Sequence, residues 1–278
     1  MAFSTVNSDR SAIVSVLSIL SGTERFASIP IIASVVRASK IANPPVPRYS
    51  EAWQPETVFA HWRARHTDGV DTVLSESDAR GLAISLFAIA RFPRVSDMAR
   101  LENDLVREDP EGLSYQFRGT KESGSDGSLT PRMWLPWRPA SDGDPFLCPA
   151  RALLVYRSMV AHKRKASARG LFLNLRDGSS IGAERISKCM QEVLKAAGID
   201  TSVYKGNSGR MAGSSAAIDA GHDPESVLST GRWSSRAVFN KFYNRAQSQQ
   251  SRKRAASVSN GTAPPGRRAR ASQPSSSA

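Results

Sequence analysis

The sequence has few of the residues that metal sites and disulfide frameworks need. It contains two cysteines, Cys148 and Cys189, and four histidines in 278 residues. The cysteines do not form a C-x-x-C pair, and the histidines do not stand in the register of a zinc finger, which argues against a zinc module and a disulfide scaffold. We therefore expect free thiols, a reducing compartment and no metal.

Long apolar runs and the common hydrolase motifs are also missing. The most apolar N-terminal stretch, AIVSVLSIL (12–20), is too short to span a bilayer and lacks a basic segment or a clean cleavage site of a signal peptide. No G-x-S-x-G, P-loop, H-E-x-x-H or paired-carboxylate pattern occurs. We expect a soluble intracellular protein without a membrane partner.

Positive charge is present in excess. The net charge is +13 with a pI of about 10.3, which favours a polyanionic partner and nucleic acid above all. No acidic residue follows residue 247, where six of the cations lie: Arg252, Lys253, Arg254, Arg267, Arg268 and Arg270. Residues 248–278 have little to bury, so we expect a disordered basic tail. Its SRKR and GRRARA segments suit nuclear import, nonspecific DNA binding or simple solubilisation.

The pattern along the chain predicts an α+β protein that is mainly α-helical. Apolar periodicity and helix start and stop signals predict two short helices within 12–40 and further helices at 75–92, 94–101, 148–164, 183–198, 208–221 and 224–231. The prolines of NPPVPRY (43–49) break any helix and mark a linker. Alternating apolar residues predict two strands, 113–119 and 131–137, that form an antiparallel hairpin with a polar tip.

Five residues stand where they could carry chemistry: Arg94, Lys121, Arg210, Trp233 and Tyr243. Two arginines that converge on one site form a fork of donors suited to phosphate. Each residue also has an ordinary structural interpretation. The arginines could be solvated or paired with an acid such as Asp97, the lysine could be a turn residue, the tryptophan could be core, and the tyrosine could close an amphipathic helix.

The order of these residues resembles the catalytic domain of the tyrosine recombinases, or phage integrases, over residues 48–245. RVSDMARLENDLV (94–106) is similar to the family's first arginine box, with Asp97 as the acidic neighbour of its arginine and Leu101 as its buried leucine. GTKES (119–123) resembles the segment that bears the catalytic lysine. NSGRMAGSSAAIDAG (207–221) resembles the second box, and GRWSSRAVFNKFYNR (231–245) resembles the Trp-to-Tyr end found in recombinases of eukaryotic mobile elements.

The resemblance implies a chemistry for each position. Tyr243 would attack a DNA phosphodiester and form a 3′-phosphotyrosyl bond, which conserves the bond energy for rejoining without a cofactor. Arg94 and Arg210 would stabilise the charge on the phosphate, with Trp233 adding its indole N–H, and Lys121 would protonate the leaving 5′-oxygen.

One position departs from the family pattern. Asn207 stands where the family has a histidine, and an asparagine cannot take up a proton near neutral pH. Asn207 would instead orient a phosphate oxygen or the Tyr243 hydroxyl.

The resemblance also predicts the domain organisation and the partners. Residues 1–47 would be a partial helical segment like the end of a core-binding domain, 48–247 the catalytic domain and 248–278 the tail. We expect site-specific DNA recombination or integration on double-stranded DNA, a homotetramer and a nuclear location. Two alternatives stay open: a catalytically impaired DNA-binding relic, or an unrelated helical nucleic-acid-binding or scaffolding protein in which these side chains do not meet.

Overall fold

The computed structural model describes residues 3–22, 26, 29–67, 74–120, 127–139 and 144–245. The chain divides into two compact units, Met1–Arg48 and Tyr49–Ala278. The first unit contains helices α1 (Phe3–Ser21) and α2 (Pro30–Ala42), so the two predicted helices are present, although α1 begins earlier than expected. Lys121, the tip of the predicted hairpin and the predicted tail lie outside the described residues.

The second unit is mainly helical, as predicted. Its helices are α3 (Pro55–Thr67), α4 (Glu76–Arg91), α5 (Val95–Met98), α6 (Pro149–Met159), α7 (Ala183–Ala196), α8 (Ser208–Asp219), α9 (Pro224–Gly231) and α10 (Arg236–Phe242). Helix α3 was not predicted, because charged and polar residues separate its two fully buried anchors, Val58 and Trp62. None of the helices described is both long and apolar enough to cross a membrane.

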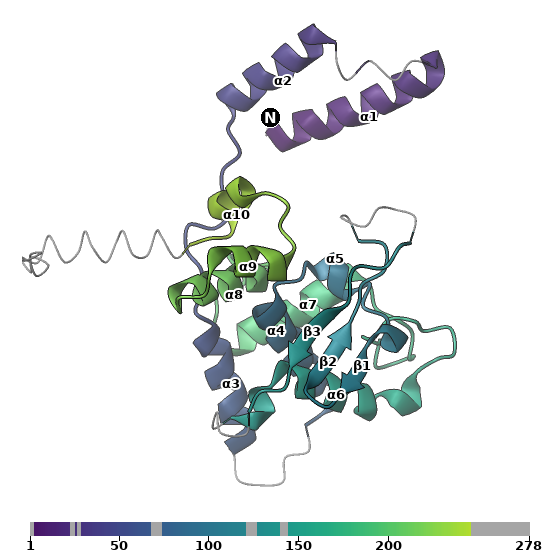
Figure 1. Ribbon diagram of the computed structural model, residues 1–278, viewed down its shortest axis with the longest axis vertical. Helices are drawn as coiled ribbons and strands as arrows, with labels where there is room; N and C mark the ends of the chain where they lie inside the picture. The colour runs from purple at the N-terminus through teal and green to yellow at the C-terminus, as the bar shows by residue number, and fades with distance from the viewer. Residues whose placement is uncertain are drawn as a thin grey trace, which may run out of the picture. The chain divides into compact units, whose positions relative to one another are not determined.

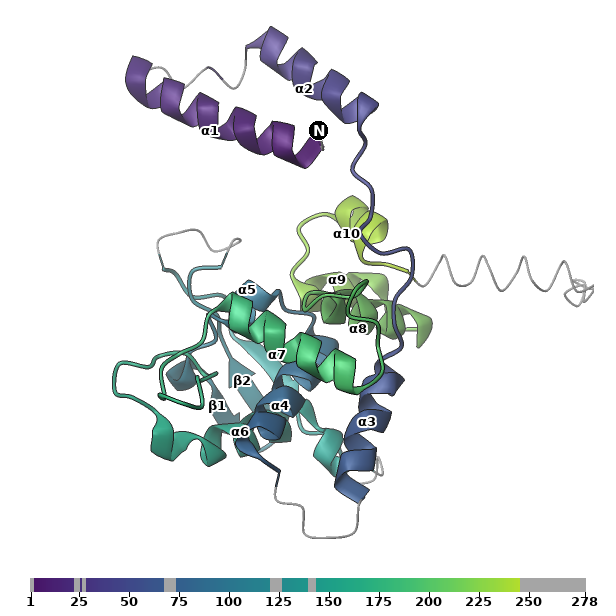
Figure 2. The same cartoon turned by 180° about the vertical axis from the view of Figure 1, so that it is seen from behind.

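Helix α4 forms the centre of this unit (Figure 1). It begins where the Ser75 hydroxyl accepts a hydrogen bond from the amide of Asp78 (3.0 Å), a standard N-cap. Every residue from Ala79 to Ile89 is buried, because α6, α7, α8 and the sheet surround the helix. The ring of Phe87 lies 5.2 Å from that of Tyr115 and joins α4 to strand β2. In Figure 2 the unit is seen from behind, with α7 in front of the sheet.

The sheet has three antiparallel strands in the order β1 (Arg107–Asp109), β2 (Gly112–Tyr115) and β3 (Met133–Pro136). The predicted pairing of the last two strands is confirmed, with Leu113 opposite Leu135. Strand β1 was not predicted, since three exposed or half-exposed residues carry no alternation. Gly112 is required at the turn between β1 and β2, because a Cβ there would lie 2.3 Å from the carbonyl oxygen of Leu135.

Two predicted helices are shorter than expected. The helix expected at 94–101 ends at Met98, because Leu101 leaves the helix to bridge Phe117 and to accept a hydrogen bond from the amide of Leu171 (2.7 Å). The helix expected at 148–164 ends at Met159 and is followed by a 3₁₀ turn, Ala161–Lys163. The end of α5 is set by contacts with distant segments, which local periodicity does not contain, whereas α6 passes into a local 3₁₀ turn.

Both cysteines are buried as free thiols. Cys148 lies at the start of α6 and Cys189 within α7. Burial raises the pKa of the Cys189 thiol, which keeps it protonated and unreactive at neutral pH.

Candidate active site

Four of the six predicted site residues line one pocket of about 370 Å³: Arg94, Asn207, Arg210 and Tyr243. They come from the start of α5, the start of α8 and the end of α10. The first two turns of α7 complete the wall with Ala183, Glu184 and Ser187. Residues that are up to about 150 positions apart in the sequence therefore share one concave surface that carries two guanidinium groups and a phenol.

Arg94 stands at the N-cap of α5 in an extended backbone conformation. Its side chain is 28% exposed, and its Nη1 lies 3.7 Å from Oδ2 of Asp97, whose carboxylate is almost fully buried. The backbone amide of Arg94 also donates weakly to that oxygen (3.4 Å). The ion pair with Asp97 that the sequence raised as an ordinary interpretation is present, and it holds Arg94 at the pocket.

Asn207 connects the second box to the first. Its side-chain oxygen accepts a hydrogen bond from the backbone amide of Val95 (3.2 Å), one of the amides at the start of α5 that has no helical partner. Next to it, the hydroxyl of Ser208 accepts from the indole of Trp53 (2.9 Å), which fixes the start of α8 in the core. The side-chain oxygen of Asn207 therefore already has a structural partner.

Arg210 is buried, with 3% of its surface exposed. Its Nη1 donates to the carbonyl oxygen of Phe92, which ends α4 in the left-handed conformation. The guanidinium carbon lies 3.8 Å from the centre of the Trp233 ring and 5.3 Å from that of Tyr243. A desolvated guanidinium over aromatic faces is a favourable cation–π arrangement, and here it orders the floor of the pocket.

Trp233 and Tyr243 belong to a second, smaller core. Their ring centres are 5.1 Å apart, and they pack beside the buried residues Phe92, Val227, Leu228 and Phe239. The structural interpretations of these two aromatics therefore hold as well. Trp233 does not itself line the pocket, and its buried indole nitrogen has no hydrogen-bond partner among the described residues.

The backbone around Tyr243 is fixed by hydrogen bonds to α8 and to the start of the unit. The hydroxyl of Ser215 donates to the carbonyl of Tyr243 (2.8 Å) and accepts from the amide of Arg245 (3.0 Å). Arg245 is buried and donates through Nε to the carbonyl of Tyr49 (2.9 Å), and burial lowers the pKa of its guanidinium. Tyr243 is thus placed in the pocket of its own chain.

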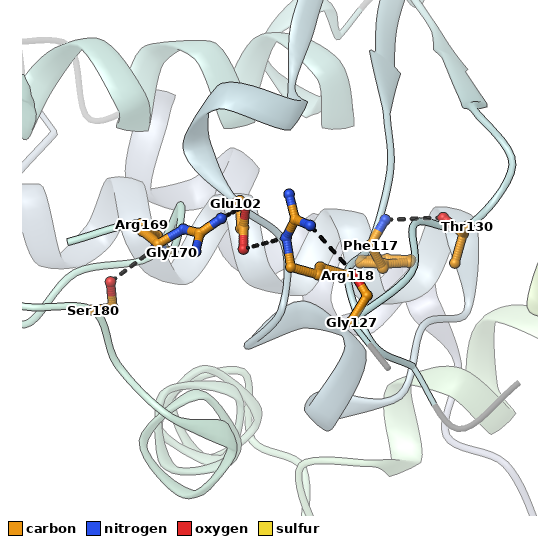
Figure 3. Close-up of polar contacts among 8 residues, drawn as sticks. All are labelled: Glu102, Phe117, Arg118, Gly127, Thr130, Arg169, Gly170 and Ser180. Carbon is orange, nitrogen blue, oxygen red and sulfur yellow. Dashed lines mark hydrogen bonds and ion pairs between the residues drawn. The ribbon is translucent and has the colours of Figure 1, made fainter. Parts of the chain in front are cut away.

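Lys121 lies outside the described residues, but both arms of its hairpin are described. Glu102 accepts from Arg118 (2.9 Å) and from Arg169 (3.2 Å), as Figure 3 shows. The hydroxyl of Thr130 accepts from the amide of Phe117 (2.9 Å), which pairs the two arms. The base of the hairpin is therefore fixed to the rest of the fold.

Sequence reasoning missed one residue near the pocket, Arg232. It donates to the hydroxyl of Thr120 (2.6 Å) and lies 3.8 Å from Asp97. In the sequence, only its position directly before Trp233 could have pointed to this residue. In the part of the chain that the structure describes, no group of three or more histidine, cysteine or carboxylate side chains gathers into a metal site.

Among the comparisons with known proteins, only the one with solved structures finds matches to this chain. No protein-family model matches the sequence, and no curated protein matches it. Among solved structures, the XerH site-specific recombinase in a post-cleavage complex with its palindromic difH substrate matches with a TM-score of 0.53 and 13% identity, over 76% of this chain and 54% of that one. The chain thus spans about half the length of XerH.

Two further solved structures are matched over most of their length. XerA recombinase matches with a TM-score of 0.52 and 14% identity, over 88% of this chain and 82% of that one. A dimer of lambda integrase residues 75–356 bound to a COC′ core site matches with a TM-score of 0.50 and 12% identity, over 88% of this chain and 80% of that one. At these identities the likeness establishes architecture. The mainly helical unit with its small antiparallel sheet has the fold of the tyrosine recombinase catalytic domain.

Proposed function

We propose that this protein cleaves and rejoins DNA by transesterification, with Tyr243 as the nucleophile, in site-specific recombination or integration. One observation carries the proposal: on a recombinase fold, the phenol of Tyr243 shares a pocket with the guanidinium groups of Arg94 and Arg210. The alternative of an unrelated scaffold requires these side chains to lie apart. The shared pocket argues against that alternative for Arg94, Arg210 and Tyr243.

The proposed reaction exchanges one phosphodiester for another. The phenol oxygen of Tyr243 attacks phosphorus and forms a 3′-phosphotyrosyl bond, the bond from phosphorus to the 5′-oxygen breaks, and Lys121 supplies the proton to that oxygen. Arg94 and Arg210 stabilise the added charge on the phosphate, a role worth a few kcal/mol for a preorganised donor. The buried N–H of Trp233 is the further donor available to a phosphate oxygen.

The partner in this proposal is double-stranded DNA, bound mainly through its phosphates by a cationic chain. XerH and lambda integrase were both solved with DNA, which supports this partner. We extend the proposal to a homotetramer that joins two DNA sites, to a nuclear location served by the basic tail, and to an origin in a eukaryotic mobile element. These three extensions rest on the sequence resemblance.

Trapping the covalent intermediate tests the proposal. Wild-type protein is incubated without metal with a pool of randomised, nicked duplexes, and denaturing gels are examined for a protein–DNA adduct. We expect an adduct in the wild type and none in Tyr243→Phe, which lacks only the attacking hydroxyl. Tyr204→Phe is the matched control, because that hydroxyl contacts the backbone of Glu51 and not the pocket, and it should keep the adduct.

The second candidate function is a DNA-binding relic, and Asn207 favours it. The side-chain oxygen of Asn207 accepts a hydrogen bond from the backbone amide of Val95, and the residue cannot act as a base. A wild type that binds DNA with a steep salt dependence but forms no adduct, even after Asn207→His, would establish the relic and exclude recombination by this chain.

A further inference from the structure

The helix that precedes Tyr243 has few apolar contacts to hold it. Helix α10 has seven residues, and one of them, Phe239, is buried. Isolated helices of this length are unstable in water, so α10 needs tertiary contacts to stay in place. Tyr243 follows α10 directly, and its amide donates to the carbonyl of Phe239 (2.8 Å). The position of the Tyr243 phenol therefore depends on what fixes the chain around it.

Ser215 of α8 makes the first of these contacts. Its hydroxyl donates to the carbonyl of Tyr243 (2.8 Å) and accepts from the amide of Arg245 (3.0 Å). A hydroxyl has one proton to donate, and Ser215 uses it on Tyr243. Every residue of Ser208–Ser215 is buried, so the serine stands on a well-packed part of α8. Because Arg210 lies on the same part of the helix, α8 fixes both a phosphate-binding cation and the backbone of the nucleophile.

Arg245 fastens the same segment to the start of the second unit. It is 8% exposed, and its Nε donates to the carbonyl of Tyr49 (2.9 Å). Its Nη1 and Nη2 both donate to the carbonyl of Lys241 in α10 (3.1 Å each). Burial of a guanidinium is costly, so an arginine at this position indicates that its fork of donors is needed there. Arg245 thereby joins α10 to the first residue of the unit.

We propose that Ser215 and Arg245 are positioning residues for the nucleophile: they form a clasp that holds Tyr243 in the pocket beside Arg210. This inference rests on the proposed function, in which the Tyr243 hydroxyl attacks a phosphate. Neither residue of the clasp lines the pocket, so both act through the backbone of the segment that carries the phenol. A misplacement of about 1 Å at a reacting atom can cost about 10²-fold in rate. The clasp can therefore govern the reaction without touching the substrate.

Ser215→Ala tests the clasp with a small change, and Ser214→Ala is the matched control. Both serines are buried in α8, but the hydroxyl of Ser214 donates to the carbonyl of Met211 in the same helix (3.2 Å). Amide hydrogen exchange should become faster over residues 236–245 in Ser215→Ala, because that segment loses its bonds to α8. It should stay unchanged there in Ser214→Ala, and unchanged in α6 in both variants. Unchanged exchange over 236–245 in Ser215→Ala would overturn the proposal, whatever the protein does to DNA.

The rate of adduct formation tests the positioning role. It is measured at saturating protein on a duplex that the adduct experiment identifies, and the dissociation constant for that duplex is measured by fluorescence anisotropy. Ser215→Ala should form the adduct about ten- to a hundredfold more slowly than the wild type, because its phenol is no longer held in place. Its dissociation constant should be unchanged, because Arg94 and Arg210 still line the pocket. Ser214→Ala should match the wild type in both measurements.

Arg245→Lys is a second variant, which keeps the test decisive if Ser215→Ala does not fold. Lysine keeps the charge and the apolar stem, but its single nitrogen cannot replace the fork that binds both Tyr49 and Lys241. The same pattern of faster exchange, slower adduct formation and unchanged affinity is expected.

The outcomes of these experiments are distinct. A folded variant that forms the adduct as fast as the wild type, or whose affinity falls as much as its rate, overturns the positioning role while the proposed function stands. A wild type that forms no adduct overturns the proposed function instead. In that case the hydrogen-exchange result still decides whether the clasp fixes residues 236–245.

Discussion

At the scale of single residues, Asn207 is the position where the pocket departs from the family pattern. Its oxygen accepts from the amide of Val95 and ties α8 to the loop of Arg94, so its role in the unliganded protein is structural. It cannot accept the proton that Tyr243 releases on attack. Within the proposed function, proton removal from the nucleophile is therefore the step that this chain supports least.

Asn207→His should accelerate adduct formation by about tenfold or more, since a positioned base contributes about 10²–10⁴-fold. A neutral imidazole has a single acceptor nitrogen, so while that nitrogen acts as the base it cannot also accept the hydrogen bond from the amide of Val95. The gain should appear as pH rises through about 6.5, because only the unprotonated ring is a base. Rates measured from pH 5 to 8 check this. Asn207→Ala loses the hydrogen bond to the Val95 amide and gains no base, so it should form the adduct more slowly than the wild type. If Asn207→His forms the adduct no faster than the wild type, proton removal is not the limiting step.

The sequence predicted the members of the pocket better than their contacts. Arg94, Asn207, Arg210 and Tyr243 meet as the family order implied, although their catalytic roles stay predictions. Arg232 was missed because its partner Thr120 is 112 positions away and because a positive φ leaves no trace in residue type. Local patterns contain neither kind of information.

At the scale of elements, the crossing of α4 and α8 brings Arg210 to the pocket. Gly213 lies at this crossing, and a Cβ there would sit 2.2 Å from the carbonyl oxygen of Ile89. Such an approach of two helix backbones admits only glycine, and the residue at 213 lies less than one turn after Arg210. The position of Arg210 therefore depends on a contact made by a residue that has no side chain.

Gly213→Ala should lower the free energy of unfolding by about 1–3 kcal/mol, because the added methyl group forces the helices apart. Urea unfolding followed by circular dichroism measures this. Gly182→Ala is the matched control: a Cβ there meets nothing within 4 Å, so the loss should be limited to the N-cap preference for glycine over alanine, about 1 kcal/mol or less. Equal urea midpoints for the two variants would contradict this prediction, because they would mean that α4 and α8 can move apart with no loss of stability.

Elements were predictable where one local pattern governs them. The buried run of α4 and the alternation of β2 and β3 are visible in the sequence. Helix α5 is shorter than its pattern because Leu101 and Phe117 bridge, and β1 exists because β2 offers it an edge. Both outcomes are set by hydrogen bonds between segments, which periodicity does not record.

At the scale of the whole molecule, charge should govern the affinity for DNA. The net charge is +13, and six cations lie beyond residue 247, where no acid offsets them. Each phosphate that a cation neutralises releases a counterion, so the logarithm of the binding constant falls with the logarithm of the salt concentration. The pocket itself contributes two of the cations, Arg94 and Arg210. Most of the slope should therefore come from residues that take no part in the chemistry.

Replacing the six tail cations with glutamine in the full chain separates these contributions. If all six contact phosphates, the salt slope should become shallower by up to about five units, at about 0.9 per contact. Fluorescence anisotropy with a duplex, measured between low and physiological salt, gives this slope. The adduct rate at saturating protein should not change, because the pocket is intact. A control with glutamine at Arg176 and Arg185, outside both tail and pocket, shows what two body charges contribute. An unchanged slope in the tail variant would instead assign the phosphate contacts to the folded unit, and the tail would then serve import or solubility rather than DNA binding.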